Sequence, residues 1–371
     1  MFKEYSEKHH EELPALTIVQ GGGTIFREES DRSLQYDKSN LSGYKMVKKD
    51  DFIVHLRSFE GGLEKANSDG IISPAYHTMH GDNVDSRFYY PYFRSYDFIN
   101  RKLVAHVYGI RDGRSIDIDG MKSIEIPYTS YEEQKTIGDY LDSLDHLITL
   151  HQRKCDETKQ LKKFMLQKMF PKNGEKNPKI RFEGFTDDWE QRKLGEVVGI
   201  YDGVHQTPQY QDSGIMFLSV ENITTLKSEK YISEEAFERD YKVYPEKGDI
   251  LMTRIGDVGT TNVVQTKEKV AFYVSLALLK PKEINSYFLS NAMKTSVFQK
   301  GLRERTLVTA IPQKINKDEI GRVNVFITNN AEEQKKIGDY FTALDHLITL
   351  HQRKCEKLKE LKKYMLHNTF V

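Results

Sequence analysis

Two pairs of histidine and cysteine are the residues of this chain that have the spacing of metal ligands. His151 precedes Cys155 by four positions, as His351 precedes Cys355, so each pair would share one face of a helix. Two such pairs on facing helices could form a His2Cys2 zinc site. In an antiparallel crossing centred on the histidines, however, the cysteines would lie about 12 Å apart along the axis. We therefore predict that these residues fix the register of two helices and bind no metal.

Other motifs of catalysis and cofactor binding are absent from the sequence. It contains no Pro-Pro pair, and hence no Asn/Asp-Pro-Pro-aromatic motif of a base-methylating pocket, no Gly-x-x-x-x-Gly-Lys-Ser/Thr loop and no His-Glu-x-x-His helix. Gly21-Gly22-Gly23-Thr24 could be interpreted as a phosphate cradle, but a turn between two strands accounts for it. The sequence predicts no catalytic residue, no cofactor and no metal.

Composition and charge set broad limits on the class of protein. The 371 residues are 38% hydrophobic and 30% charged, and 55 Lys and Arg balance 55 Asp and Glu. Because nucleic-acid-binding domains are often basic overall, a nucleic-acid partner would have to meet a local patch. The charged N-terminus predicts no signal peptide, and the longest apolar run, at 270–279, predicts a buried strand. With only two cysteines, we expect a reducing, cytoplasmic location.

A long repeat is the main feature of the chain. Residues 132–171 and 332–371 align without a gap and are identical at 27 of 40 positions, including LDHLITLHQRKC in both copies. Ser130 and Asn330 each lie three positions before a glutamate, in the order of a helix capping box. Apolar residues then recur at alternating intervals of four and three, which predicts two helices with a coiled-coil seam. Forty helical residues would extend over about 60 Å, so each helix requires a partner of similar length.

Each predicted helix follows a head of mixed α/β character. Short β-branched runs predict strands in both heads: DFIVHL, GIISPAY and SIEIPY in the first, and IMFLSV, DILMTRI and VNVFI in the second. The heads share a sparse pattern, Asp51-Phe52-Ile53 against Asp249-Ile250-Leu251, but their loops differ almost completely. The predicted segments are a first head at 1–131, a first helix at 132–171, a linker at 172–193, a second head at 194–331 and a second helix at 332–371.

The contrast between repeated helices and unlike heads indicates a division of roles. Two copies of one helix surface would bind two copies of one partner, or each other. Two heads of one architecture with different loops would recognise two different targets. We therefore predict an α+β fold, with two mixed α/β heads, a coiled-coil spacer and an internal pseudo-two-fold repeat.

Several segments give the chain a family resemblance. They are the joints IPYTSYEEQKTIG and VFITNNAEEQKKIG, the LDHLITLHQRK helices, WEQRKLGEV at 189–197 and GVHQTP at 203–208. The arrangement resembles the specificity subunit of a type I restriction–modification system, over essentially the whole chain. That resemblance implies two target-recognition domains separated by two antiparallel helices, which together recognise a bipartite, asymmetric sequence in double-stranded DNA.

The resemblance also implies the partners and cofactors of the complex. The helices would dock two adenine-N6 methyltransferase subunits, and motor-nuclease (restriction) subunits would join through them. The chain itself would do no chemistry, because S-adenosylmethionine, ATP and Mg would be bound by the partner subunits. The first head begins at MFKEY, which aligns near Val198–Tyr201. It lacks the Trp…Lys-Leu-Gly segment that opens the second head, so we expect a head shortened by about one strand.

Candidate DNA contacts are polar and basic residues of the loops that differ between the heads. Arginine, glutamine, asparagine and lysine can recognise base edges, whereas serine, threonine and basic side chains also bind phosphates. Tyr89-Tyr90-Pro91-Tyr92-Phe93 could stack on bases, but core packing is the favoured interpretation. The candidates are Gln20, Arg27, Arg57, Ser58, Arg111 and Arg114 in the first head, and His205, Gln206, Thr207, Arg254, Arg303, Arg305, Thr306, Gln313 and Lys314 in the second.

Two other classes of function remain open from the sequence. The chain could be a coiled-coil assembly scaffold whose heads bind proteins, which the stoichiometry of methyltransferase binding would distinguish. It could also be an enzyme with a cryptic site in a head, although the missing catalytic motifs speak against this.

Overall fold

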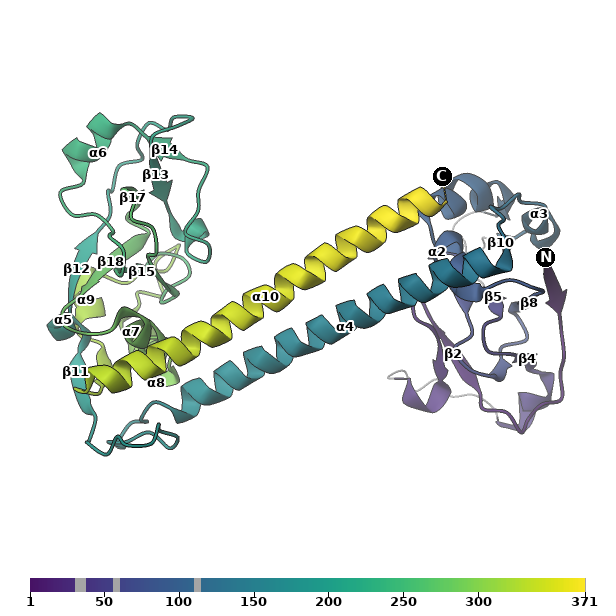
Figure 1. Ribbon diagram of the computed structural model, residues 1–371, viewed down its shortest axis with the longest axis horizontal. Helices are drawn as coiled ribbons and strands as arrows, with labels where there is room; N and C mark the ends of the chain where they lie inside the picture. Colours follow the sequence, from purple (N-terminus) through teal and green to yellow (C-terminus); the bar gives the residue numbers. More distant parts are fainter. Residues whose placement is uncertain (31–37, 56–60, 110–114, 371) are drawn as a thin grey trace. The chain divides into compact units, whose positions relative to one another are not determined.

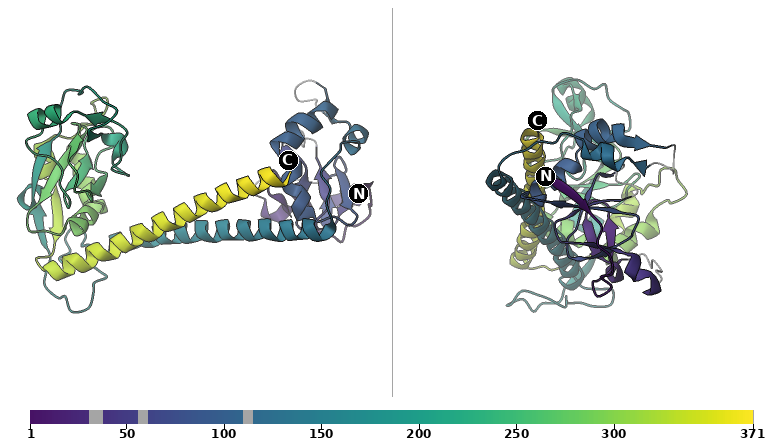
Figure 2. Two further views of the ribbon diagram at one scale, coloured as in Figure 1. Left: turned by 45° about the horizontal axis from the view of Figure 1, so that its top comes forward. Right: turned by 90° about the vertical axis from the view of Figure 1, so that its right-hand side faces the viewer.

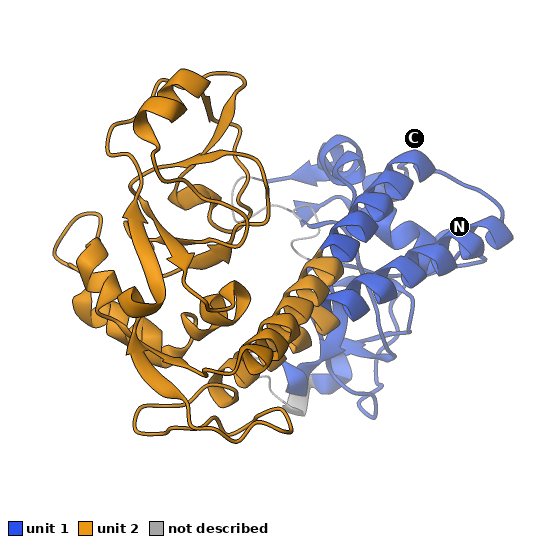
Figure 3. Ribbon diagram, turned by 60° about the vertical axis from the view of Figure 1, so that its left-hand side comes forward, with its two compact units in different colours: residues 1–152, 353–371 blue, residues 153–352 orange. Residues whose placement is uncertain are grey.

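The computed structural model describes residues 1–30, 38–55, 61–109 and 115–370. The chain divides into two compact units, one of residues 1–152 with 353–371 and the other of residues 153–352 (Figure 3). Each unit therefore combines one head with one part of each of two long helices, α4 (Tyr131–Lys168) and α10 (Ala331–Thr369) (Figure 1). Segments that lie far apart in the sequence thus share one unit.

Each head is built on a four-stranded antiparallel sheet with the same strand order. The first sheet consists of β1 (Phe2–Tyr5), β8 (His77–Gly81), β5 (Phe52–Val54) and β6 (Glu64–Lys65), in this order. The second consists of β12 (Val198–Asp202), β18 (Leu276–Pro281), β15 (Ile250–Thr253) and β16 (Thr261–Val263). The registers also agree, because Phe52 pairs with Met79 as Ile250 pairs with Leu279. The predicted correspondence of MFKEY with Val198–Tyr201 is therefore confirmed.

Smaller sheets and short helices complete the heads. The first head adds the pairs β2 (Leu16–Val19) with β3 (Gly23–Phe26), β4 (Lys45–Val47) with β7 (Gly70–Ile72), and β9 (Val107–Tyr108) with β10 (Ser115–Ile116). The second adds β13 (Ile215–Leu218) between β14 (Tyr231–Ile232) and β17 (Val270–Phe272), and β11 (Glu190–Lys193) paired with β19 (Asn324–Ile327). The helices are α2 (Ser86–Phe93), α3 (Ile118–Lys122), α5 (Leu194–Val197), α6 (Glu234–Asp240), α7 (Ser286–Ala292), α8 (Ser296–Arg305) and α9 (Lys317–Gly321).

Two strand predictions are wrong. The run VAFYVSLALL is not one strand but two, β17 and β18, which belong to different sheets. SIEIPY of the first head forms no strand, whereas its counterpart in the second head is β19. The physical difference is the partner: β19 pairs with β11, and the described part of the first head contains no strand equivalent to β11.

Two other interpretations are confirmed. Gly21 and Gly22 form the turn of the β2–β3 hairpin, as expected of a plain strand-to-strand connection. The YYPYF segment lies in α2, and Tyr89, Tyr92 and Phe93 are buried in the core of the first head. Their rings therefore pack inside the protein and are not available to stack on a base.

Both long helices begin with the predicted caps. The Ser130 hydroxyl accepts a hydrogen bond from the backbone N of Glu133 at 3.3 Å. Asn330 Oδ1 accepts from the backbone N of Glu332 and Glu333 at 3.0 and 3.1 Å. These contacts satisfy amides that the geometry of a helix start leaves without an internal partner.

One buried glutamine joins each long helix to its head. Gln134 Oε1 accepts a hydrogen bond from Asp85 N at 3.0 Å, and Gln334 Oε1 accepts one from Asn285 N at 2.8 Å. Both Nε2 atoms donate at 2.7 Å to a threonine carbonyl that precedes the helix. Asp85 and Asn285 are the N-caps of α2 and α7. The first turn of each long helix is thus fixed to the first turn of a head helix.

The long helices pair in antiparallel fashion within each unit (Figure 2). In the first unit, Lys362 Nζ of α10 lies 2.5 Å from Asp145 of α4. In the second unit, Lys162 Nζ of α4 lies 2.5 Å from Asp345 of α10. Both ion pairs join an aspartate in the N-terminal half of one helix to a lysine in the C-terminal half of the other. The two aspartates occupy equivalent positions of the repeat, 200 residues apart, and so do the two lysines.

The two cysteines are buried in this helix pairing. The Cys355 thiol lies 3.3 Å from the carbonyl oxygen of Ile148 in the first unit, and the Cys155 thiol lies 4.0 Å from that of Ile348 in the second. Each thiol can therefore donate to a backbone carbonyl of the facing helix. Among the described residues, no group of three or more His, Cys, Asp and Glu could hold a metal ion.

The residues that follow the two long helices pack in the cores of the heads: those after α4 in the second head, and those after α10 in the first. The Phe170 ring, just after α4, packs against Trp189 and Phe288 of the second head, with centroids 5.7 Å away in both contacts. The Phe370 ring, just after α10, packs against Phe88 and Tyr92 of the first head at 5.0 and 5.2 Å. The repeat therefore extends to the last aromatic residue of both copies.

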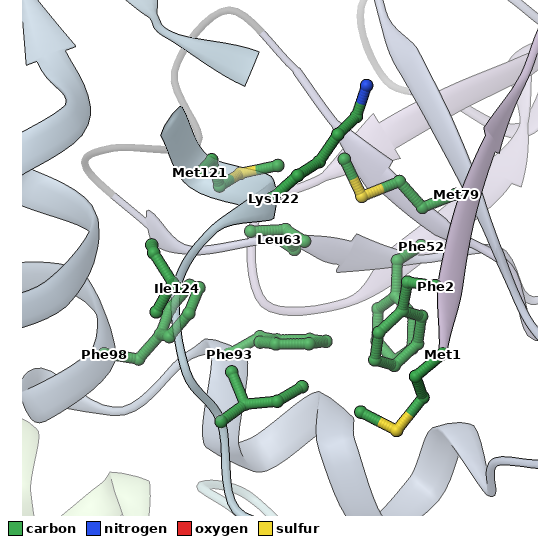
Figure 4. A pocket seen from close by; sticks show the side chains of 11 residues that line it. Met1, Phe2, Phe52, Leu63, Met79, Phe93, Phe98, Met121, Lys122 and Ile124 are labelled. Carbon is green, nitrogen blue, oxygen red and sulfur yellow. The ribbon is translucent and has the colours of Figure 1, made fainter. Parts of the chain in front are cut away.

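A cavity of about 200 Å³ lies in the apolar core of the first head (Figure 4). Its wall includes Met121 and Ile124, which correspond to Ile320 and Val323 beside α9 in the second head. There, Leu194 and Val197 of α5 complete one continuous buried cluster, and Leu194 N donates to Val323 O at 2.9 Å. The first head is thus less completely packed at this position. The lining residues are Met1, Phe2, Phe52, Leu63, Met79, Phe93, Phe98, Met121, Lys122, Ile124 and Ile126.

A partly buried lysine lies where the second head meets the helix pair. Lys294 follows α7, close to the ion pair of Lys162 and Asp345. Burial lowers the pKa of Lys294 to about 8; Lys162 lowers this pKa further, and Asp345 opposes the shift. The charged form of Lys294 is therefore unfavourable in the folded second unit.

We expect Lys294→Met to raise the free energy of unfolding of the second unit at pH 7 by about 1–3 kcal/mol. In the wild type, the unfolded lysine binds a proton up to pH of about 10.4, so stability should rise from pH 8 to 10 and the variant should lose this rise. Urea unfolding followed by the fluorescence of Trp189, the single tryptophan, measures both effects. The exposed Lys282→Met is the control, and equal pH slopes in all three proteins would contradict the prediction.

Candidate nucleic-acid interface

Three loops of the second head meet at one buried arginine. Arg254 follows β15, is only 7% exposed, and its Nη1 donates to the carboxylate of Asp202 at the end of β12. Its Nε donates to the carbonyl oxygen of Ile315 at 3.2 Å. Asp202 leads into the loop 203–209, Arg254 into 255–260, and Ile315 ends the segment 306–315. The guanidinium group therefore fixes the bases of all three loops.

The segment from 306 to 315 is a small hairpin held against the loop that follows β15. Leu307 N donates to Lys314 O at 2.8 Å, which closes the hairpin. Gln313 Nε2 donates to Gly256 O at 2.9 Å, and Gly256 N donates to Gln313 O at 2.8 Å. The hairpin is thus attached along one side, at Gln313, to the loop that follows β15.

The other candidates of the second head lie around these loops. His205, Gln206 and Thr207 are exposed in the loop that begins at Asp202. Arg303 is exposed near the end of α8, whereas Arg305 is half-buried and donates to Gly301 O at 3.1 Å. Thr306 donates to Leu302 O at 2.8 Å, which leaves its oxygen free to accept. The structure therefore brings Arg254, Gln313 and Lys314 into one set of contacts, with the remaining candidates at its edges.

In the first head, a glycine-rich hairpin carries the candidate Gln20. The Glu64 carboxylate, which is fully buried, accepts hydrogen bonds from Gly21 N at 2.7 Å and Gly23 N at 3.2 Å. It also binds Arg94 and accepts from the Tyr90 hydroxyl at 2.7 Å. Burial raises the pKa of Tyr90, and the Glu64 carboxylate raises it further. Gln20 itself is exposed at the start of the turn, so Glu64 fixes the backbone that presents it.

The remaining candidates of the first head are less fully described. Arg27 is half-buried, and its Nη1 donates to the Tyr44 hydroxyl at 3.3 Å. Arg57 and Ser58, as well as Arg111 and Arg114, lie outside the described residues. Arg111 and Arg114 fall in sequence between β9 and β10, the pair that corresponds to the Leu307–Lys314 hairpin of the second head. In sequence, both heads therefore have predicted DNA contacts between equivalent pairing positions.

Sequence reasoning missed the residues that position these loops. Glu64 and Asp202 were not predicted, because a single acidic residue gives no signal of the contacts that it makes. Val308 and Ile311 at the hairpin tip were also missed, since apolar residues predict burial, yet their side chains are 69% and 100% exposed. A polar loop interrupted by aliphatic residues is the signal that could have indicated them.

A second repeated surface lies on the long helices. We name it the outer stripe, because its apolar side chains lie on the long helices and are about 37–65% exposed. Leu147 of the first unit and Leu347 of the second occupy the same position of the repeat. The stripe comprises Tyr140, Leu147, Leu161 and Phe164 on α4, and Leu347, Leu350, Leu361 and Tyr364 on α10.

Comparison with known proteins identifies the second head and its helix. Residues 186–360 match the family described as type I restriction modification DNA specificity domain. These residues are thus similar to type I DNA specificity domains. The specificity domain thus defined includes Arg254, Gln313, Lys314 and most of α10.

Two curated relatives are similar to the chain in sequence. The type I restriction enzyme MjaVIII specificity subunit of Methanocaldococcus jannaschii is 23% identical over 267 residues, which are 68% of this chain and 62% of the relative. The putative MjaX specificity subunit of the same organism is 22% identical over 271 residues, 68% of this chain and 60% of the relative. The chain therefore spans less than two thirds of the length of these relatives.

The solved structures show the fold beyond the specificity domain. The type I restriction–modification S subunit from M. genitalium aligns over 100% of this chain and 96% of its own, with a TM-score of 0.62 and 18% identity. A structure reported for complex assembly and conformational transition of a type I system aligns over 99% and 96%, with a TM-score of 0.51 and 18% identity. The chain has the S-subunit fold, with two mixed α/β heads and two long helices. No helix in the described part of the chain is long and apolar enough to cross a membrane.

We expect Arg254→Met to loosen the loops of the second head without unfolding it. Loss of the guanidinium leaves the Asp202 carboxylate and the Ile315 carbonyl without this donor, which costs about 1–3 kcal/mol. Hydrogen exchange at the amides of Gly256 and Ile315 should accelerate about tenfold or more. Arg303→Met, at an exposed arginine, is the matched control and should leave both rates unchanged. Unchanged exchange in Arg254→Met would show that the arginine does not hold the loops.

Proposed function

We propose that the chain is the DNA-recognition subunit of a type I restriction–modification complex. Each head, within 1–131 and 194–331, recognises one part of a bipartite, asymmetric site in double-stranded DNA. The observation that carries this proposal is the specificity domain at 186–360, joined to another head with the same sheet and different loops. The helical segments 132–171 and 332–371 serve as the spacer that sets the unspecified gap, and the linker 172–193 leads from the first helix to the second head.

DNA recognition by this chain is a matter of positioning hydrogen-bonding groups. In the second head, Gln313 and Lys314 lie on a hairpin that Arg254 and Gly256 hold in place. An amide can contact adenine through two hydrogen bonds, and lysine can bind guanine or a phosphate. Because the chain carries no net charge, its affinity for DNA is low without basic partners and falls steeply with salt.

The outer stripe provides the surface for two copies of one partner. Each unit presents one copy, since Leu147 and Leu361 lie in the first unit, and Leu161 and Leu347 in the second. Exposed leucines and aromatic residues that repeat at the same positions favour burial against a protein. We assign this partner as the methyltransferase subunit, with restriction subunits joining the assembly. The chain contributes no catalytic group, and S-adenosylmethionine, ATP and Mg are bound by the partners. A scaffold whose heads bind proteins is less well supported, because the matched family is a DNA specificity domain.

Mapping of methylated adenines tests the recognition function directly. Co-expression of the chain with its methyltransferase should yield one asymmetric, two-part motif with a constant gap. Gln313→Ala should relax the sequence preference in one part of this motif, by about 1–3 kcal/mol at the affected base, and leave the other part unchanged. The exposed Gln160→Ala, on α4, is the matched control. Methylation without a two-part motif would refute the proposed function.

Charge placed on the outer stripe should remove one partner at a time. Burial of one leucine contributes about 1.5–3 kcal/mol, so Leu147→Asp should weaken one methyltransferase site by more than tenfold. Native mass spectrometry should then show one methyltransferase per chain for Leu147→Asp or Leu347→Asp and none for the double variant. Lys135→Asp reverses a charge elsewhere on α4 and should retain two. Two bound copies in the double variant would place the docking surface elsewhere.

A further inference from the structure

The tip of the Leu307–Lys314 hairpin combines aliphatic side chains with a basic surrounding. Leu307, Val308 and Ile311 are 45%, 69% and 100% exposed, within five positions of one another. Single exposed aliphatic residues are ordinary on protein surfaces, but three on one small hairpin form a patch that favours an interaction. In the described part of the chain, no neighbouring element covers Ile311.

The charges beside this tip favour a polyanion over a protein or a membrane. The segment 300–314 contains four basic residues and a single acidic one, Glu304. In the described part of the chain, no carboxylate lies within ion-pair distance of Arg303 or Lys314, although both are exposed. The protein as a whole has no net charge, so the basic residues at the end of α8, together with Lys314, are a local feature beside the tip.

The hairpin is also fixed firmly enough to present its tip in a defined place. Leu307 and Lys314 form its closing pair. The residues at its C-terminal end are bonded to the loop that follows β15: Gln313 to Gly256, and Ile315 N to Arg254 O at 3.0 Å. The segment is closed by the single bridging pair Leu307–Lys314, so it is narrower than the two-stranded ribbon that the major groove of DNA admits. Among the base edges in that groove, the C5-methyl group of thymine is the apolar one.

We propose that Val308 and Ile311 contact thymine methyl groups in the part of the DNA site that the second head recognises. This inference rests on the proposed function and deepens it. Gln313 and Lys314 supply the polar contacts of the same hairpin, while the aliphatic tip distinguishes thymine from cytosine by its methyl group. The second head therefore has at least one thymine in its part of the recognition sequence.

Replacement of thymine by deoxyuridine tests the proposal, because it removes only the methyl group. The complex of the chain with its methyltransferase should bind a duplex with the mapped motif about 3–10-fold more weakly when the thymines of the second head's part are replaced. The variant Val308→Ala/Ile311→Ala should bind the thymine duplex with the same loss and should not respond to the replacement. Ile180→Ala, at an exposed isoleucine of the linker, is the matched control and should respond like the wild type.

The outcomes separate the inference from the function on which it rests. Specific binding that ignores the replacement in the wild type, or a half-site without thymine, overturns the thymine contact and leaves DNA recognition intact. Absence of any specific binding by the complex refutes the proposed function itself. A replacement effect that persists unchanged in the double variant also overturns the inference, because another residue would then contact the methyl group.

Discussion

The structure depends on the hydrogen bonds of two buried glutamines, Gln134 and Gln334. Each side chain bridges the start of a long helix and the N-cap of a head helix, and both of its polar ends have partners. A buried amide left without these partners would be costly, so the bond geometry permits one orientation of helix and head. A long helix can position the loops of a head only if this joint is rigid.

Beyond this joint, the two units repeat the same contacts. The helix that starts beside α2 or α7 carries an aspartate that meets a lysine of the other helix, Asp145 with Lys362 and Asp345 with Lys162. Repeated helices keep equivalent contacts, while the sheets they support share strand order and register. Loops of different sequence can therefore be carried on the same support without a change in the long helices.

The sequence predicted the elements that depend on local patterns and missed those that depend on distant partners. Caps at Ser130 and Asn330 and the heptad seam follow from spacing alone, and so do the long helices. SIEIPY has the composition of a strand, but a strand also needs a hydrogen-bonding neighbour, which only the second head provides as β11. Likewise, the residue type of Arg254 predicts a DNA contact, but the sequence gives no sign of its burial beside Asp202, where it also supports the loops. Neither the neighbour nor the burial is visible in a single segment of sequence.

The placement of Phe370 has a consequence for how the protein is made. This residue packs on Phe88 and Tyr92, so the first head shares its core with the residue that follows α10. During synthesis the N-terminal residues leave the ribosome first, and domains generally fold in that order. Here the second unit, whose segments lie between 153 and 352, can be completed while the first still waits for residues 353–370. The head that is translated first is therefore the one that is finished last.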